Sequence, residues 1–387
     1  MCIYTIYALI YNSINKNAAS YLCGMKRNRT SRPVAIWLLV GVFMLMVQII
    51  LGGITRLTGS GLSITEWNVI TGALPPLNEQ QWLTEFHKYQ QTPQYRLLNS
   101  DFTLSNFKFI FFWEWLHRLW ARLMGVVFLI PFLIFLIQRR FSADMIKPLL
   151  ILFLLGALQG AVGWIMVASG LTGDAVYVKP TRLAVHFIFA LILLSYTFWF
   201  ALQLLVKRND FVYKKGLKGF TGFIISVLLL QLIYGAFMAG YKAAPAAPTW
   251  PDINGEFVPA YIFNRPEGLR SIFQNLIVIQ FIHRMLAYVL VVLILAWSVA
   301  AFRFKRSVLF AKARMFPLLL VLLQLILGIV TVLNSLKMIP NRWTVFQWMA
   351  QMHQLVAMLL LLSLVFNLFL LKKQRGFNTT AFDPHVI

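Results

Sequence analysis

Eight long apolar segments run through this chain, and each approaches or exceeds the roughly 20 residues that a helix needs to cross a bilayer. They occupy residues 34–54, 109–137, 148–168, 183–206, 219–240, 272–302, 315–336 and 345–371. Backbone groups inside a bilayer have no water to bind, so runs of this length satisfy them as helices. The pattern predicts an all-α integral membrane protein with eight transmembrane helices.

The basic residues have an uneven distribution between these segments. The net charge of +23 could indicate a nucleic-acid partner. However, Lys and Arg gather in the N-terminal region, in alternate short connections and after the last segment, for example at Arg139, Arg140, Lys214 and Lys215. This is the positive-inside pattern, with both termini cytoplasmic. The charge therefore indicates topology and contact with anionic membrane lipids, and no nucleic-acid partner is expected.

The polar landmarks of the chain occur twice. His117 in the second segment and His283 in the sixth are each followed by an arginine, and they lie 166 residues apart. His186 in the fourth segment and His353 in the eighth lie 167 residues apart. Because each half holds an even number of segments, both halves have the same orientation. The repeat predicts two pseudo-symmetric four-helix bundles.

The repeat sets the domain boundaries. The N-terminal half covers 34–206 and the C-terminal half 207–371, with tails at 1–33 and 372–387. Residues 1–24 lack a signal-peptide pattern, so we interpret them as an upstream start before Met25 or as a disordered tail. Both cysteines of the chain lie in this N-terminal tail. We therefore expect no disulfide in the outer loops and no cysteine-rich metal site.

Four of the six histidines lie inside the apolar segments, where an ionisable side chain is a candidate for function. All four lie on even-numbered segments, near the outer face, and the repeat divides them two and two. Two imidazoles at one depth suit the axial ligation of a flat heme in a four-helix bundle. Zinc would need three or four ligands at one centre. A histidine hydrogen-bonded to a neighbouring helix is the alternative for each one taken singly.

Three arginines accompany these histidines: Arg118, Arg284 and Arg122. An arginine in a membrane span needs an anion, and heme propionates would supply two. The alternative is that these side chains extend to the lipid headgroups, because all three lie near the outer boundary.

Glu114 makes the two halves unequal. It lies three residues before His117, on the same helical face, whereas Gln280 holds the equivalent position before His283. A carboxylate beside a macrocycle can stabilise developing positive charge or move a proton. The asymmetry suggests that the first site reacts and the second carries electrons. Pairing of Glu114 with Arg118 or Arg122 is the structural alternative.

Two motifs carry a family resemblance. One is the cluster Glu114-Trp115-Leu116-His117-Arg118; the other begins at Gly52-Gly53-Ile54-Thr55-Arg56, runs through Ser63 and continues at Glu66-Trp67 and from Thr71 to Leu77. Both resemble the heme A synthase family, and the resemblance extends over about residues 33–371. The chain is similar to the alphaproteobacterial and mitochondrial branch, which lacks a cysteine pair in the first outer loop.

The resemblance implies a specific reaction, the oxidation of the C8 methyl group of heme O to the formyl group of heme A for terminal oxidases. It implies that His117 and His186 bracket the iron of the substrate heme, while His283 and His353 ligate a heme b cofactor. Glu114 would assist at the oxidised carbon. Heme O would come from a heme O synthase. The protein would lie in the cell inner (plasma) membrane, with its heme sites toward the outer face.

Further expectations concern partners and the first loop. No flavin, nicotinamide or iron–sulfur motif occurs in the sequence, so an unidentified partner is expected to supply electrons, and the oligomeric state stays open. We also expect Gly52, Gly53 and Gly59 to let the first outer loop approach the macrocycle as a lid that excludes water.

Two other functions share most of these features. A diheme electron-transfer cytochrome would use the same histidines but would have no need for Glu114. A heme transporter or chaperone would exchange heme without altering its periphery.

Overall fold

The computed structural model describes residues 31–66, 71–262, 268–304, 307–337 and 343–373. Eight of its helices are long and apolar enough to cross a membrane, which confirms the predicted all-α multi-pass class. They are α2 (Ser31–Leu57), α5 (Leu104–Ile137), α6 (Ala143–Ala168), α7 (Pro180–Leu205), α8 (Lys215–Gly240), α10 (Leu276–Phe302), α11 with α12 (Val308–Ala313 and Phe316–Leu333) and α13 (Val345–Leu370). The interpretation of residues 1–24 lies outside the described residues.

Two spans contain a break or a bend that the sequence did not predict. The segment predicted at 272–302 is broken at Asn275, whose side chain caps the start of α10 and ends the short helix α9 (Ser271–Gln274). The segment predicted at 315–336 begins earlier, as α11, and bends before α12. Arg314 holds this bend by donating to the carbonyl oxygens of Ala301 at 2.8 Å and Phe304 at 2.7 Å.

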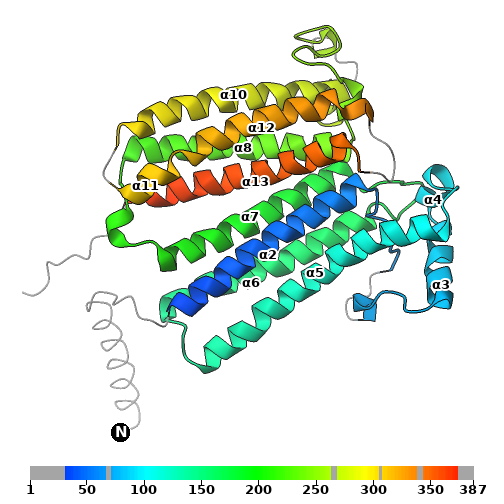
Figure 1. Ribbon diagram of the computed structural model, residues 1–387, viewed down its shortest axis with the longest axis horizontal. Coiled ribbons are helices and arrows are strands. Elements are labelled where there is room, and N and C mark those ends of the chain that lie inside the picture. The colour runs from blue at the N-terminus through cyan, green and yellow to red at the C-terminus, as the bar shows by residue number, and fades with distance from the viewer. Residues whose placement is uncertain (1–30, 67–70, 263–267, 305–306, 338–342, 374–387) are drawn as a thin grey trace, which may run out of the picture.

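The spans form two groups that lie side by side (Figure 1). In the N-terminal group α2 packs against α5 and α7, and α6 packs against α7. In the C-terminal group α8 packs against α10 and α13, and α12 packs against α10 and α13. The groups meet where α13 contacts α2 and α7 and where α7 contacts α8. The boundaries and pseudo-symmetry of the two halves stay predictions.

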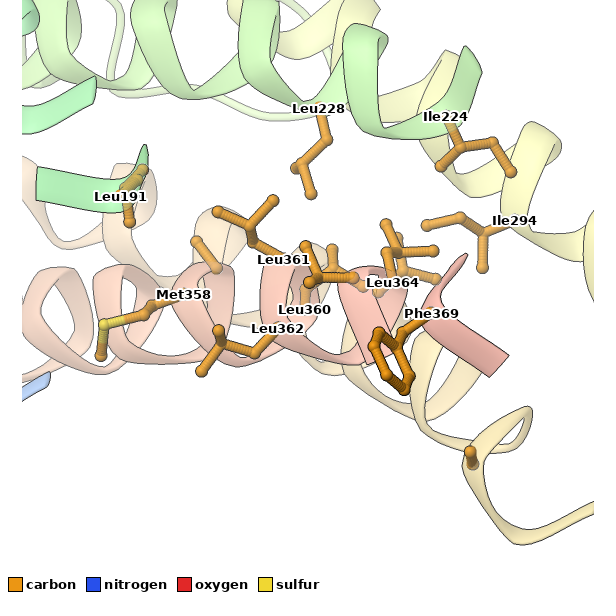
Figure 2. Close-up of a cluster of buried hydrophobic side chains, with 14 of the residues drawn as sticks. Leu191, Ile224, Leu228, Ile294, Met358, Leu360, Leu361, Leu362, Leu364 and Phe369 are labelled. Atoms are coloured by element: carbon orange, nitrogen blue, oxygen red, sulfur yellow. The ribbon is translucent and has the colours of Figure 1, made fainter. Parts of the chain in front are cut away.

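Helix α13 forms the centre of the largest apolar core. Figure 2 shows its leucines and Phe369 beside residues from α8 and α10, with Leu361 facing Leu228. Leu364 and Phe369 are fully buried, as is Ile294 of α10. This core lies between the two groups and extends away from the end that carries α3 and α4.

A small helical lobe lies at this end, beyond the start of α5 (Figure 1). The first long loop contains α3 (Glu79–Gln90) and α4 (Pro93–Leu98), two helices that the sequence analysis did not predict. Tyr89 of α3 is fully buried and stacks on Phe107 of α5 with ring centres 5.3 Å apart. Burial raises the pKa of Tyr89 to about 12, so its phenol stays neutral.

The contact of α8 with α10 includes a buried hydrogen bond. Trp297 donates its indole N–H to Oγ1 of Thr221 at 2.8 Å, and both residues are fully buried. Replacing Trp297 by phenylalanine is expected to lower the free energy of unfolding by about 1 kcal/mol for the lost bond, plus a contribution from lost packing. Thermal unfolding in detergent measures the change. A Thr221→Val variant in the Trp297→Phe background should add little, and full additivity would contradict the coupling.

Candidate functional site

All four membrane histidines lie toward the end that carries α3 and α4. His117 is on α5, His186 on α7, His283 on α10 and His353 on α13, and each helix enters from this end. Each histidine lies in the first half of its helix. The geometry therefore gathers four imidazoles in one layer of the protein.

His283 and His353 face each other with ring centres 6.4 Å apart and planes at 68°. An imidazole nitrogen binds a transition metal at about 2 Å, and the ring centre lies about 1 Å behind it, so two rings on one ion have centres roughly 6 Å apart. The pair fits axial ligation of a heme iron. Among the described residues there is no group of three or more His, Cys, Asp or Glu side chains that could hold a metal, so zinc finds no such site there.

Each histidine contacts a glutamine on the preceding span. The amide nitrogens of these glutamines lie 3.1–3.4 Å from a ring nitrogen, in the pairs Gln48 with His117, Gln159 with His186, Gln231 with His283 and Gln324 with His353. The carbonyl oxygen of each amide is buried without a hydrogen-bond partner in the described structure. The contact of these glutamines with the imidazoles was not predicted from the sequence.

A glycine four residues after each glutamine lies against the same ring. A methyl group added at these glycines would lie 2.9–3.4 Å from Cε1 of the histidine, in the pairs Gly52 with His117, Gly163 with His186, Gly235 with His283 and Gly328 with His353. The spacing Gln-x-x-x-Gly is visible in the sequence and could have revealed the contact, because residues i and i+4 share one helical face.

The glycines of the first motif do not all lie in the loop. Helix α2 continues to Leu57, so Gly52 and Gly53 are helical, in agreement with the predicted segment 34–54. Gly53 instead faces the glutamines of α13 described below. Gly59 does lie in a turn, with φ +70, a backbone conformation that favours glycine.

Glu114 is 3% exposed and fastens the first loop to α5. Its Oε2 accepts hydrogen bonds from the backbone N–H of Ser63 (2.8 Å) and Ile64 (3.0 Å) and from the Ser63 hydroxyl (2.7 Å). Its Oε1 accepts one from Arg118 at 2.7 Å. The carboxylate is thus held by four hydrogen-bond donors, one helical turn before His117.

Arg118 extends the same attachment by donating to the carbonyl oxygens of Ile64 at 3.1 Å and Glu66 at 3.0 Å. The indole N–H of Trp115 donates to the carbonyl of Ala73 at 3.0 Å. Three residues of the Glu114–Arg118 motif therefore bind the first outer loop. The loop is thereby attached to α5 at residues that flank His117, and its role as a lid stays a prediction.

The second half repeats this attachment with a neutral side chain. Gln280 is fully buried and donates to the carbonyl of Ala243 at 2.7 Å, and its oxygen accepts from Arg284 at 2.6 Å. Arg284 also donates to the carbonyl oxygens of Ala247, Thr249 and Asp252 at 2.8, 3.0 and 2.8 Å. Both arginines bind loop carbonyls here; pairing with propionates stays a prediction for Arg118, Arg284 and Arg122.

The two halves touch beside their histidines. Gln354, next to His353, donates to the carbonyl of Ile49 at 2.8 Å, and Ile49 is next to Gln48. Gly53 permits this approach, because an added methyl group would lie 2.7 Å from the Gln354 oxygen. One hydrogen bond between α2 and α13 thus links the surroundings of His117 and His353.

Known proteins resemble this chain over most of its length. A family model described as cytochrome oxidase assembly protein matches residues 35–365. A protein named heme A synthase from Cereibacter sphaeroides is 43% identical over 320 residues, 79% of this chain and 81% of the relative. Proteins of the same name from Flavobacterium psychrophilum and Granulibacter bethesdensis are 37% and 40% identical over 348 and 358 residues, 89% and 92% of this chain and 98% and 90% of the relatives.

Proposed function

This chain belongs to the cytochrome oxidase assembly protein family and serves as a heme A synthase, and we propose that it oxidises the C8 methyl group of heme O to a formyl group in its N-terminal half. In this proposal His117 and His186 hold the substrate heme, and His283 and His353 hold a heme b cofactor. The protein acts in the cell inner membrane, with both termini cytoplasmic and the heme sites toward the outer face.

The unequal acid between two matching sites carries the assignment of the halves. Each half has a histidine pair and an arginine that fastens a loop, but Glu114 stands where the second half has Gln280. Oxidation of a methyl group builds positive charge on the carbon, and a fixed carboxylate stabilises such charge in a site without water. An electron-carrying site has no such requirement. The acid therefore favours the first half as the reacting one.

The space around the histidines favours the same assignment. In the C-terminal half α10 packs against α12, and Val321 and Val291 belong to its apolar core or pack on it. The positions that correspond in the repeat are Gly156 on α6 and Gly125 on α5. Methyl groups added there would meet nothing within 4 Å in the described chain, and α5 and α6 share no substantial interface there. Gly125 and Gly156 are exposed on the surface of the described chain, and in this proposal the isoprenoid tail of the substrate lies along that surface.

The roles of the residues follow from these contacts. The bound heme supplies the iron chemistry of the oxidation. His117 and His186 orient the macrocycle, Glu114 holds a negative charge one turn from His117, and Ser63 and Arg118 fix that carboxylate in place. The loop from Thr58 to Glu66, bound through Glu114 and Arg118, excludes water from the reacting edge.

The contact between α2 and α13 supports exchange of electrons between the two sites. An external partner would exchange electrons with the C-terminal heme, and the hydrogen bond from Gln354 to Ile49 joins the two surroundings over a short path. That partner is unidentified. Because both sites lie among apolar spans, a lipid-soluble electron carrier is a candidate.

Heme extraction tests the function. The protein is produced in cells that make heme O and lack a heme A synthase, and the extracted hemes are separated by chromatography. Heme A is the expected product, with heme b retained on the purified protein. Heme b and heme O without heme A would favour the diheme cytochrome or the heme transporter, which leave the heme periphery unchanged.

Substitutions that copy the second half test the assignment of the substrate site. Gly156→Val gives the first half the valine that the second half has at Val321. It is expected to lower binding of heme O at least about tenfold, because the valine would occupy space used by the isoprenoid tail of heme O. Binding of heme B, which has no such tail, should fall much less. Spectral titration with both hemes measures the difference. Gly222→Ala on α8, which also meets nothing within 4 Å in the described structure, is the control, and equal losses for both hemes would contradict the assignment.

A further inference from the structure

The four glutamine–glycine pairs beside the histidines have a common geometry that the oxidation chemistry alone does not require. In every pair the glycine meets Cε1 of the ring as its nearest atom and Nδ1 as the next. The four imidazoles therefore present the same edge to the neighbouring helix. The same contact thus recurs on four different helix pairs, which indicates a common structural role.

The contact of His353 shows what this orientation does. Its Nδ1 lies 3.1 Å from the backbone carbonyl oxygen of Gln324, and its Nε2 lies 3.1 Å from the side-chain amide nitrogen of the same residue. A carbonyl oxygen only accepts hydrogen bonds, so Nδ1 carries the proton. An amide NH₂ group only donates, so Nε2 has a free lone pair. One glutamine thus contacts both nitrogens of one ring and is compatible with one neutral tautomer.

The glycine makes this contact reachable. The carbonyl of residue i points toward residue i+4 of its helix, so a side chain at i+4 would stand between that carbonyl and an incoming ring. A methyl group at Gly328 would lie 3.0 Å from Cε1 and 3.6 Å from Nδ1 of His353. The ring would have to move away by several tenths of an ångström, and the bond from Nδ1 to the carbonyl would lengthen.

We propose that the Gln324–Gly328 unit is a seat for the axial imidazole of His353: the glycine admits the ring edge, the backbone carbonyl of Gln324 fixes the proton on Nδ1, and the side-chain amide covers Nε2 until iron takes its place. This inference rests on the proposed function, because it takes heme iron as the ligand of Nε2. The other three units share the glycine and the amide contact, but Nδ1 of His117 and of His283 has no hydrogen-bond partner in the described structure, and Nδ1 of His186 lies nearest to the Gln159 amide. Gly328 is a positioning residue that acts through His353.

Partners of this kind are a general requirement of metal-binding histidines. The second ring nitrogen normally donates to an acceptor, which fixes the tautomer and the rotation of the ring, and loss of the partner costs about 10–100-fold in metal affinity. The buried side-chain oxygen of Gln324, which has no partner in the described structure, is consistent with an amide that turns its nitrogen toward Nε2. If such an oxygen turned toward Nε2, two acceptors would face a neutral ring that has a single N–H.

The C-terminal half allows a graded test on heme b that does not depend on turnover. An added methyl group would lie 3.0 Å from the ring at Gly328 but 3.4 Å, an ordinary contact, at Gly235. Gly222 on α8 meets nothing within 4 Å in the described chain. We expect Gly328→Ala to lower heme b retention at least about tenfold and to change the low-spin electron paramagnetic resonance signal and the midpoint potential. Gly235→Ala should change them slightly and Gly222→Ala not at all.

Two controls keep the result interpretable. Circular dichroism and gel filtration of the Gly328→Ala protein establish that it is folded, and binding of heme O to the N-terminal half gives a second measure of its integrity. A folded Gly328→Ala protein with the heme b signal and potential of Gly222→Ala would overturn the proposal, as would equal effects at Gly235 and Gly328. Heme A formation is measured in parallel. If the wild-type protein had intact heme b spectra but formed no heme A, the proposed function would be contradicted. The spectra of the glycine variants would still test whether Gly328 positions His353.

Discussion

Replacing Glu114 by glutamine is expected to reduce heme A formation at least about 100-fold, the loss typical when one preorganised electrostatic group is removed from a site. The change keeps the size of the side chain and removes its charge. It also leaves one of the partners Ser63 and Arg118 facing an amide group of the wrong polarity. Bound hemes should persist, because no histidine is altered. Chromatography of extracted hemes and absorption spectra of the purified variant measure both results.

Ser63→Ala is the matched control for this experiment. It removes one donor to Glu114 Oε2 but keeps the carboxylate, the backbone donors of Ser63 and Ile64 and the contact with Arg118. Because the charge of Glu114 and three of its four hydrogen-bond donors remain, activity should fall less than in Glu114→Gln. Full heme A formation by Glu114→Gln would mean that Glu114 only anchors the loop, as Gln280 does in the other half.

Replacing His353 by alanine is expected to remove heme b almost entirely, because the alanine leaves His283 as a single axial ligand. Loss of a ligand should exceed the 10–100-fold cost of losing a ligand's partner, so less than about a tenth of the wild-type heme b should remain. Heme A formation should fall with it if electrons pass through the second site. Pyridine hemochrome spectra give the heme content per protein.

Two further histidine variants make this result specific. His186→Ala should keep heme b and lose binding of heme O, because it alters the first half alone. His87→Ala should change neither, since His87 is exposed on α3 and bonds only to Gln90 among the described hydrogen bonds. Loss of heme b in His186→Ala with retention in His353→Ala would reverse the assignment of the two halves.

The spans could be predicted from the sequence because each depends on one local property, a long apolar run. The unpredicted features occur where a single polar or strained position redirects the chain. Asn275 ends one short helix and caps the next, and Arg314 fixes a bend through backbone carbonyls that lie one connection earlier. Hydropathy does not report such contacts, so the break at Asn275 and the bend at Arg314 were not predicted.

The candidate site was only partly readable from the sequence. The histidines were found because an ionisable residue at membrane depth is rare, and Glu114 because its counterpart is Gln280. The attachment of Glu114 to Ser63 was not predictable, since it joins residues that are distant in the chain and depends on the path of the loop. The Gln-x-x-x-Gly spacing is visible in the sequence, but its contact with a histidine ring is apparent only in the structure.

The position of α13 has a consequence for how the protein is made. Of the eight spans it is the most enclosed by the rest of the described chain, and it contacts α2 and α7 as well as its own neighbours α8 and α12. It is also the last of them to emerge from the ribosome. The earlier spans must therefore wait in the bilayer with their central contact surface covered only by lipid. We therefore expect heme to bind after the finished polypeptide is released. A premature stop before Val345 would remove α13 and disturb the packing of both bundles.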